Sequence, residues 1–137
     1  MSYDISKLTF DEITIGYVKE FQIIVTESLV ANFAKLSGDF NPIHMNEDYA
    51  KSTKFKRRVV HGMFLASFLS RMVGMHLPGK NALYVSQSLE FPNPCFIDDE
   101  ITVSSTVSDK SISTKMIKVD SRIMNDKNEV LLKGVGR

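Results

Sequence analysis

This sequence contains a single cysteine, Cys95, among its 137 residues. One cysteine excludes an intramolecular disulfide and suits a reducing compartment. It lacks the nearby histidine pattern of a cysteine nucleophile, so we expect Cys95 to be structural. A disulfide-stabilised scaffold is therefore excluded.

Strong net charge and long hydrophobic runs are lacking as well. Lysine and arginine number 17 and aspartate and glutamate 16, which gives a net charge of +1 and no basis for a nucleic-acid partner. No run approaches the roughly 20 apolar residues that cross a bilayer. The first residues, MSYDISKLTFDE, do not have a basic region followed by an apolar one. We expect no membrane partner and a cytoplasmic location.

The composition that is present fits one globular domain. Hydrophobic residues make up 43% and charged residues 24% of the chain, which is too short for two ordinary domains. No internal repeat, low-complexity tract or linker divides the sequence. We therefore treat residues 1–137 as a single domain.

The N-terminal part predicts a strand followed by a short helix. Residues 17–26 are rich in β-branched and aromatic side chains, with Phe21, Ile23 and Val25 alternating on one face. Thr26 can cap a helix that ends at Gly38. The apolar positions of that helix are Leu29, Phe33 and Leu36, flanked by Val30 and Ala34.

A second helix is predicted at residues 60–75, VHGMFLASFLSRMVGM, where Arg71 is the only charge. A helix that is small or apolar nearly all round is buried on most sides. It is too short to span a membrane, so the material that encloses it must be protein.

Alternating strand patterns follow at residues 83–91, 101–107 and 117–123, and residues 130–136 make a final strand. Polar turn residues at 109–110 and 125–128 are suited to joining antiparallel neighbours. This order predicts an α+β fold, with one curved antiparallel sheet wrapped around one long apolar helix. Such a unit leaves an edge strand and apolar surface, so we expect a homodimer or a higher oligomer.

The stretch SGDFNPIH places Asp39, Asn41, Pro42 and His44 close together. Pro42 disfavours helical geometry at Asn41, so we expect a fixed loop from which a carboxylate and an imidazole turn into one cleft. Asn41 can close this loop by an Asx-type hydrogen bond. Ordinary polar turns use the same residues, so the spacing leaves an acid–base pair and a surface turn equally open.

A metal site is another alternative, because Glu47 and Asp48 follow His44. His61 and His76 do not stand at the spacing of a zinc site, however, so we expect no metal. No serine lies in an elbow motif that would indicate nucleophilic catalysis.

Gly62 lies at the start of the apolar helix, where backbone amides are free and the helix dipole favours negative charge. A carbonyl oxygen held there would be polarised as in an oxyanion hole. A glycine chosen for packing against the sheet would look the same in the sequence, so both interpretations stay open.

Several separated motifs together resemble one family. The segments SGDFNPIH, VVHGMFLASFLSRMVG, LPGK and YVSQSLEFPNPCFIDDEIT are similar, in order and spacing, to the MaoC-like or (R)-specific enoyl-CoA hydratases of the hot-dog fold. The resemblance covers about residues 33–107. It implies an obligate dimer and the cofactor-free, reversible hydration of trans-2-enoyl-CoA to (R)-3-hydroxyacyl-CoA, which is a hydro-lyase reaction.

The resemblance also implies roles for individual residues. Asp39 and His44 correspond to the catalytic pair. The chemistry of hydration favours His44 as the base and Asp39 as the proton donor after relay, and the sequence leaves both assignments open. Gly62 corresponds to the amide donor to the thioester carbonyl. Asn41 corresponds to a residue that orders the loop, and Ser70 to a supporting hydrogen-bonding group near the pair.

One departure from the family pattern precedes the VVHG step. Relatives commonly have Arg-Pro there, whereas this chain has Arg57-Arg58. We expect the loss of the proline to loosen the chain before the helix.

Substrate-binding residues can be proposed from a basic cluster and from the apolar helix. Lys54, Lys56, Arg57 and Arg58 could meet the phosphates of coenzyme A, or they could form a solvated face. An acyl tunnel could be lined from the helix, although its spacing favours plain core. The side chains in question are Met63, Phe64, Phe68, Met72 and Met75.

Three other functions remain as alternatives. The same chemistry run backwards on acyl carrier protein would make the chain a 3-hydroxyacyl-[acyl-carrier-protein] dehydratase of fatty-acid synthesis. A hot-dog thioesterase would not need the Asp39–His44 loop. A non-catalytic acyl-thioester-binding module would leave that pair unexplained.

Overall fold

The structure, a computed structural model, describes residues 3–137. Its helices are α1 (Glu27–Ser37), α2 (Pro42–Met45), α3 (Glu47–Lys51) and α4 (Gly62–Arg71), and α4 continues into the π-helical turn η1 (Met72–His76). The strands are β1 (Val18–Ile24), β2 (Glu100–Ser111), β3 (Met116–Asn125) and β4 (Val130–Gly136).

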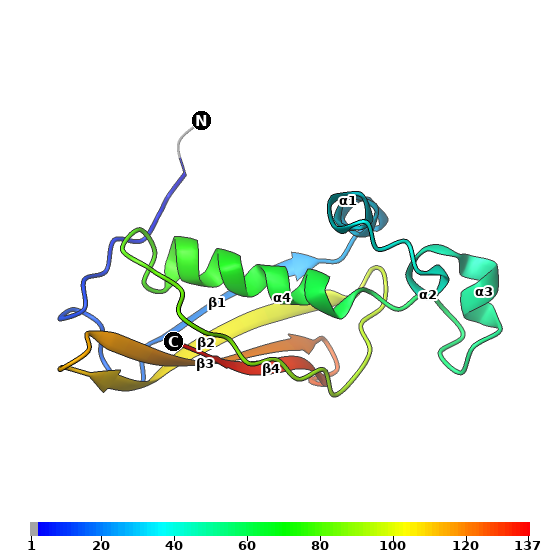
Figure 1. The fold of residues 1–137 in the computed structure, drawn as a ribbon. Helices are drawn as coiled ribbons and strands as arrows, with labels where there is room; N and C mark the ends of the chain where they lie inside the picture. Colours follow the sequence, from blue (N-terminus) through cyan, green and yellow to red (C-terminus); the bar gives the residue numbers. More distant parts are fainter. Residues whose placement is uncertain (1–2) are drawn as a thin grey trace.

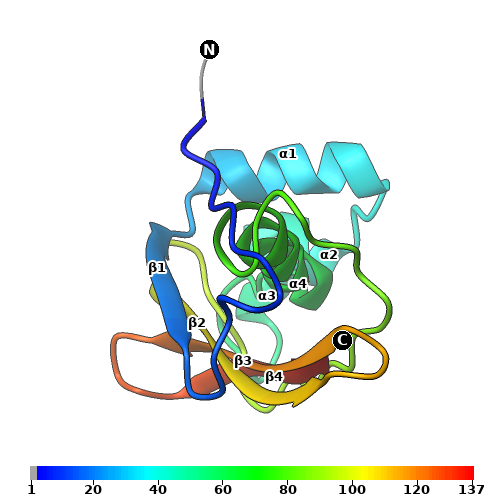
Figure 2. The same ribbon diagram turned by 90° about the vertical axis from the view of Figure 1, so that its left-hand side faces the viewer.

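The four strands form one antiparallel sheet in the order β1-β2-β3-β4. The sheet curves around α4, which runs along its inner face, and α1 crosses on the other side of α4 (Figures 1 and 2). The predicted α+β architecture is therefore confirmed.

Alternating burial explains how the central strands of the sheet are fixed. Ile101, Val103 and Val107 of β2 are completely buried, and Val103 stands opposite Ile123 of β3. A shift of one residue would move this apolar row to the outer face, so burial sets the register. Ser105 and Ser121 interrupt the row but share a hydrogen bond of 2.6 Å, which satisfies both buried hydroxyls.

Helix α1 begins and ends where the sequence predicts. The side chain of Thr26 accepts a hydrogen bond from the Leu29 amide, and Gly38 adopts the left-handed conformation, with φ of 79°. The predicted inner face needs correction, because Val30 and Ala34 are the buried residues whereas Leu36 is 89% exposed. Leu36 lies in the last turn of α1, beyond the part of the helix that packs on the core.

The apolar helix starts at Gly62 rather than at Val60, because Val60 is extended and donates its amide to the Cys95 carbonyl at 2.7 Å. Phe64, Leu65 and Leu69 are buried, as expected. Burial does not extend all round in the single chain, however, because one stripe of α4 and η1 is exposed. We call it the α4 stripe, and it consists of Met63, Ser67, Ser70 and Gly74.

The strand predicted at residues 83–91 is not regular. Isolated bridges join Gln87 to Gly136 and Glu90 to Lys133, and the Ser88 amide donates to the Val135 carbonyl, so the segment pairs antiparallel with β4 only at intervals. A side chain at Gly134 would collide with the Ser88 carbonyl oxygen. The two backbones therefore approach each other more closely than in a flat ladder, which accounts for the broken pairing.

The turn predicted at residues 109–110 also lies elsewhere. Strand β2 continues to Ser111 through an irregularity between Val107 and Asp109, and the connection to β3 is made by residues 112–115. The turn at 125–128 is confirmed, with the Asn125 side chain accepting from the Lys127 amide. Within residues 3–137, no helix is both long and apolar enough to cross a membrane.

Candidate active site

The Asp39–His44 stretch folds around a single helical turn. We predicted a loop, but Pro42 starts the helix α2, and Asn41 caps it by accepting from the Ile43 amide at 3.1 Å. Proline is favoured at the first position of a helix because its missing N–H would have no partner there. Asn41 thus orders this stretch locally by capping α2.

Asp39 and His44 face each other without a direct hydrogen bond. Asp39 Oδ2 lies 3.9 Å from His44 Nε2, and the two side chains are 50% and 17% exposed. Asp39 Oδ1 accepts the Asn41 amide at 3.1 Å, which fixes the carboxylate on its own loop. A gap of this size is too long for a hydrogen bond and suits one water between the two groups.

The contact on the other side of the imidazole fixes the tautomer of His44. His44 Nδ1 lies 2.6 Å from the Val59 carbonyl oxygen. A carbonyl oxygen only accepts hydrogen bonds, so Nδ1 carries a proton. In the neutral ring the lone pair is then on Nε2, which is the nitrogen that faces Asp39. His44 is therefore oriented to accept a proton on that side.

His61 is part of the site, although we did not predict a role for it. It is 2% exposed and donates from Nε2 to the Asp39 carbonyl oxygen at 2.9 Å. Its ring lies between Phe33, at 5.0 Å, and His44, at 4.0 Å between ring centres. Burial lowers the pKa of His61 and so keeps the ring neutral. Its position immediately before Gly62 was the available signal.

Gly62 lies next to the His61 ring, at the first position of α4. Within residues 3–137, no acceptor is found for its amide N–H, as expected for the first turn of a helix. A Cβ at Gly62 would lie 3.0–3.3 Å from the Phe91 ring. The structure therefore supports the packing interpretation of the glycine and also leaves the amide free.

Asp39, His44 and His61 offer possible metal-ligating atoms that lie within 4.8 Å of one another. Zinc holds nitrogen and oxygen ligands at about 2.0–2.2 Å, so the ligand atoms of a tetrahedral site are about 3.4 Å apart. His61 also uses Nε2 to bind the Asp39 carbonyl. The trio therefore fits a metal poorly as it stands.

The residues expected to bind substrate lie outside this cluster. Lys54, Lys56 and Arg57 are exposed in the connection between α3 and α4, where the Arg57 guanidinium stacks 3.6 Å from the Phe96 ring centre. Met63 follows Gly62 and is 59% exposed. Ser70 is exposed on α4, and at the rise of an α-helix it lies about 12 Å along the axis from Gly62.

Of the side chains considered for an acyl tunnel, those that are buried belong to the core. Phe64 is 5% exposed and Met72 is fully buried in the main hydrophobic cluster, and Phe68 packs against that cluster. The core interpretation is confirmed for these three residues.

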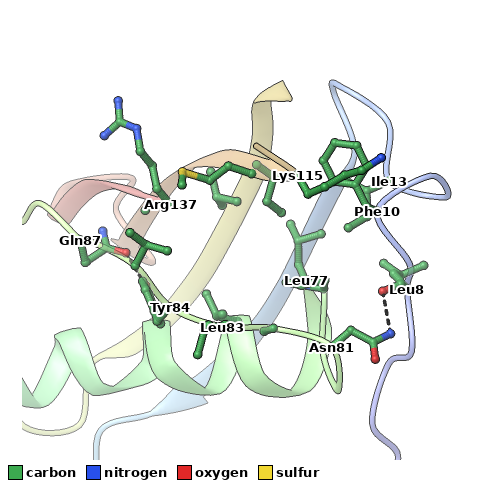
Figure 3. A pocket seen from close by; sticks show the side chains of 18 of the residues that line it. Leu8, Phe10, Ile13, Leu77, Asn81, Leu83, Tyr84, Gln87, Lys115 and Arg137 are labelled. Atoms are coloured by element: carbon green, nitrogen blue, oxygen red, sulfur yellow. Dashed lines mark hydrogen bonds between the residues drawn. The ribbon is translucent and has the colours of Figure 1, made fainter. Parts of the chain in front are cut away.

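A cavity of about 290 Å³ lies at the other end of the molecule (Figure 3). Leu8 and Phe10 line it from the N-terminal segment, and Val73 and Leu77 line it beyond the end of α4. Arg137 is also among its lining residues. Neither member of the Asp39–His44 pair lines this cavity.

Comparison with known proteins assigns the chain to a family. Residues 11–128 match the family described as MaoC like domain. The chain belongs to the MaoC-like domain family. This MaoC-like protein is 46% identical over 99 residues to the (R)-specific enoyl-CoA hydratase of Rhodospirillum rubrum, an alignment that covers 72% of this chain and 69% of that protein.

Other relatives of the MaoC-like protein agree with this assignment. It is 32% identical over 117 residues to a mitochondrial 3-hydroxyacyl-[acyl-carrier-protein] dehydratase of Arabidopsis thaliana, which covers 84% of this chain and 69% of that protein. The solved structure of an (R)-hydratase from A. caviae involved in PHA biosynthesis has a TM-score of 0.88 at 35% identity, covering 90% of this chain and 94% of that one. The predicted family and hot-dog fold are confirmed.

Proposed function

We propose that this MaoC-like protein hydrates trans-2-enoyl-CoA to (R)-3-hydroxyacyl-CoA and catalyses the reverse dehydration, as a hydro-lyase of fatty acid metabolism. The observation that carries the proposal is the geometry of His44. The Val59 carbonyl holds the proton of the ring on Nδ1, and the basic Nε2 faces Asp39 across a gap that suits one water. Such a pair can activate water for addition to a conjugated thioester.

The reaction proceeds by moving one proton of that water. His44 Nε2 takes a proton as the water oxygen attacks C3 of the enoyl chain. The electron pair of the double bond moves towards the thioester carbonyl and forms an enolate. The proton then passes from His44 to Asp39, once the two side chains come within hydrogen-bond distance, and Asp39 delivers it to C2. The hydroxyl and the proton both come from one water, so the sequence balances without a cofactor.

The free amide of Gly62 supports the enolate oxygen. It lies at the positive end of the α4 dipole and next to His61, whose ring stacks on His44. Removing one such donor typically costs about 10²–10³-fold in rate. We assign Gly62 the role of donor to the thioester carbonyl.

The test is to follow the loss of conjugated-thioester absorbance with enoyl-CoA substrates of graded chain length, and then to determine the chirality of the product. We expect turnover that yields the R product. An S product, or binding of enoyl-CoA without turnover, would refute the proposal, and the second result would favour an acyl-thioester-binding module.

A second candidate is dehydration of 3-hydroxyacyl chains on acyl carrier protein. The similarity to the Arabidopsis thaliana dehydratase, which extends over 84% of this chain, favours keeping it. The two functions share the same reacting atoms and differ only in the carrier. Comparing kcat/KM for CoA and carrier-protein thioesters of equal chain length distinguishes them.

For the carrier we propose contacts in the connection before α4. Lys54, Lys56 and Arg57 are exposed there and could bind the phosphates of coenzyme A, with Met63 beside the thioester. Replacing Lys54 and Lys56 together by alanine should raise KM for the CoA substrate and leave kcat unchanged. An unchanged KM would show that the two lysines only form a solvated face.

We further propose that the protein works as a homodimer. Nothing within residues 3–137 covers the α4 stripe, and no described residue pairs with the outer backbone edge of the 83–91 segment beside it. The large hydrophobic residues exposed on that segment are Leu83, Tyr84, Val85 and Phe91, at 87%, 39%, 61% and 44%. A second copy would cover both surfaces. Light scattering during size-exclusion chromatography should give twice the chain mass of 15.5 kDa. The mass of a single chain would refute the proposed homodimer.

A two-fold dimer would bring Ser70 of one copy near the candidate active site of the other. Two copies of one edge segment pair antiparallel about a two-fold axis, so their α4 helices also run antiparallel. The start of one α4 would then lie beside the end of the other, where Ser70 and the mouth of the cavity are. Mixing inactive Asp39→Asn chains with cavity-blocked Val73→Trp chains should then restore activity, since one site of each mixed dimer is intact. No restored activity would place each site within one chain.

A cytoplasmic location is consistent with this proposal, since the only cysteine is a free, buried thiol. Fractionation of the source cells with an antibody against the chain would test it, and recovery in an oxidising compartment would refute it.

A further inference from the structure

Arg58 contacts the candidate active site from outside. Its side chain is 10% exposed, and its Nε donates to the His44 carbonyl oxygen at 2.6 Å. Its Nη1 donates to Glu27 Oε2 at 2.7 Å, and its Nη2 lies 3.9 Å from the sulfur of Met45. The guanidinium therefore connects the first turn of α1 to the last turn of α2, where His44 lies.

The residue after Arg58 continues this connection. The Val59 amide donates to the Ile43 carbonyl at 3.1 Å, and the Val59 carbonyl accepts from His44 Nδ1 at 2.6 Å. Together with Arg58, these contacts hold residues 43–44 from the backbone and from the side chain. His61 adds the contact to the Asp39 carbonyl.

Helix α2 needs such support because it is very short. It has only four residues, and a single turn is not stable by itself. The His44 carbonyl lies in its last turn, where no following helical amide is available to bind it. Without Arg58, no donor within residues 3–137 would bind this carbonyl, and the direction of the His44 side chain would depend on the Val59 contact and on stacking against His61.

We propose that Arg58 is a positioning residue for the hydration reaction, because it holds α2 against α1 and thereby keeps His44 Nε2 directed at Asp39. This inference rests on the proposed function. It also revises the sequence-based expectation for this position, where the family proline is absent: Arg58 ties the chain down before α4.

Arg58 is poorly placed to act on the substrate itself. Its guanidinium is directed at Glu27 and at the His44 carbonyl, and most of it is shielded from solvent. A role in binding phosphate groups would change KM. A positioning role changes kcat, because it acts on the geometry of the proton transfer.

The experiment compares Arg58→Ala, Arg58→Lys and Glu27→Gln with Arg122→Ala, a matched variant of an exposed arginine on the outer face of β3. We expect Arg58→Ala to lower kcat by about 10- to 100-fold, with KM for enoyl-CoA within about threefold of the parent protein. Lysine keeps the charge but cannot bind the His44 carbonyl and Glu27 at once as the guanidinium does, so the kcat of Arg58→Lys should lie between those of the parent protein and Arg58→Ala. Glu27→Gln should lower kcat only a few-fold, and Arg122→Ala should change nothing.

A spectroscopic measurement tests the position of His44 directly. In protein with ¹⁵N-labelled histidine, the Nδ1 proton bound to the Val59 carbonyl gives a resolved signal, and loss of Arg58 should shift or broaden it. An unchanged signal with parental kcat in Arg58→Ala would overturn the inference, as would a change in KM alone. If Arg58→Ala does not fold, Arg58→Lys and Glu27→Gln decide by the same criteria. If the parent protein hydrates no thioester, the proposed function fails, and the signal still reports whether Arg58 positions His44.

Discussion

Replacing Asp39 by asparagine should abolish proton transfer while leaving the site folded. The backbone carbonyl of Asp39 accepts a hydrogen bond from His61 Nε2, and the side-chain oxygen Oδ1 of Asp39 accepts one from the Asn41 amide. Asparagine keeps both contacts, because its amide oxygen can take the place of Oδ1. The Asp39 side chain is half exposed, and its Oδ2 lies 3.9 Å from His44 Nε2. Loss of this interaction should therefore cost less than about 1 kcal/mol of stability.

The effect on turnover should be much larger. The amide NH₂ that replaces Oδ2 has no lone pair available to accept a proton, so it cannot relay one from His44 to C2. General acid–base catalysis of this kind contributes about 10²–10⁴-fold. We therefore expect kcat to fall by that factor, which corresponds to a rise of about 2.7–5.4 kcal/mol in the activation barrier.

The assay follows the absorbance of the conjugated thioester at saturating enoyl-CoA, and thermal unfolding of the same samples checks the fold. Asp120→Asn serves as the matched control, because Asp120 is an exposed aspartate on the outer face of β3. If Asp39→Asn keeps more than about one third of the parental kcat, the assignment of Asp39 as the proton carrier is wrong.

Three further predictions concern the rest of the molecule. Burial lowers the pKa of His61 and of His76, so below about pH 6.5 the unfolded chain binds protons that the folded chain does not. The free energy of unfolding, measured by urea titration, should therefore fall as the pH is lowered through this range, and it should fall less steeply in His61→Gln. Burial raises the pKa of Cys95 to about 12, so at pH 8 a thiol reagent should label the native protein on the order of a thousandfold more slowly than the unfolded chain. Val85→Lys should reduce the mass measured by light scattering to that of one chain, because it introduces a charge at the exposed edge. The three predictions would be contradicted, in this order, by the parental pH dependence of stability in His61→Gln, by rapid labelling of Cys95 in the native protein, and by an unchanged mass of Val85→Lys.

The regular parts of the fold could be predicted because each carries its own local signal. The strands β2 and β3 alternate with a period of two residues, and α1 has a capping threonine at one end and a glycine at the other. The 83–91 segment shows the same alternation and yet is not a regular strand. Its pairing depends on the close approach that Gly134 allows from β4, and alternation in the segment itself carries no information about its partner.

The candidate site was predictable only in part, for a related reason. Asp39, His44 and Gly62 lie in motifs whose spacing indicates chemistry. Each contact that orients them joins a side chain to a backbone carbonyl of another segment: Arg58 donates to His44, His61 to Asp39, and His44 to Val59. Backbone acceptors are the same at every position, so the sequence contains no pattern that would identify which residues bind them.

Gly62 shows how a structural and a catalytic requirement can meet at one residue. Alanine would present the same backbone N–H at the start of α4, so donation to a thioester oxygen does not by itself require glycine. The Phe91 ring favours it, because a Cβ would lie only 3.0–3.3 Å from ring atoms and the ring would have to shift to accept it. The catalytic assignment therefore belongs to the position, which is the first turn of α4 beside His61, and the identity of the residue follows from packing. The packing interpretation of Gly62 therefore concerns its missing Cβ, and the catalytic interpretation concerns its backbone N–H.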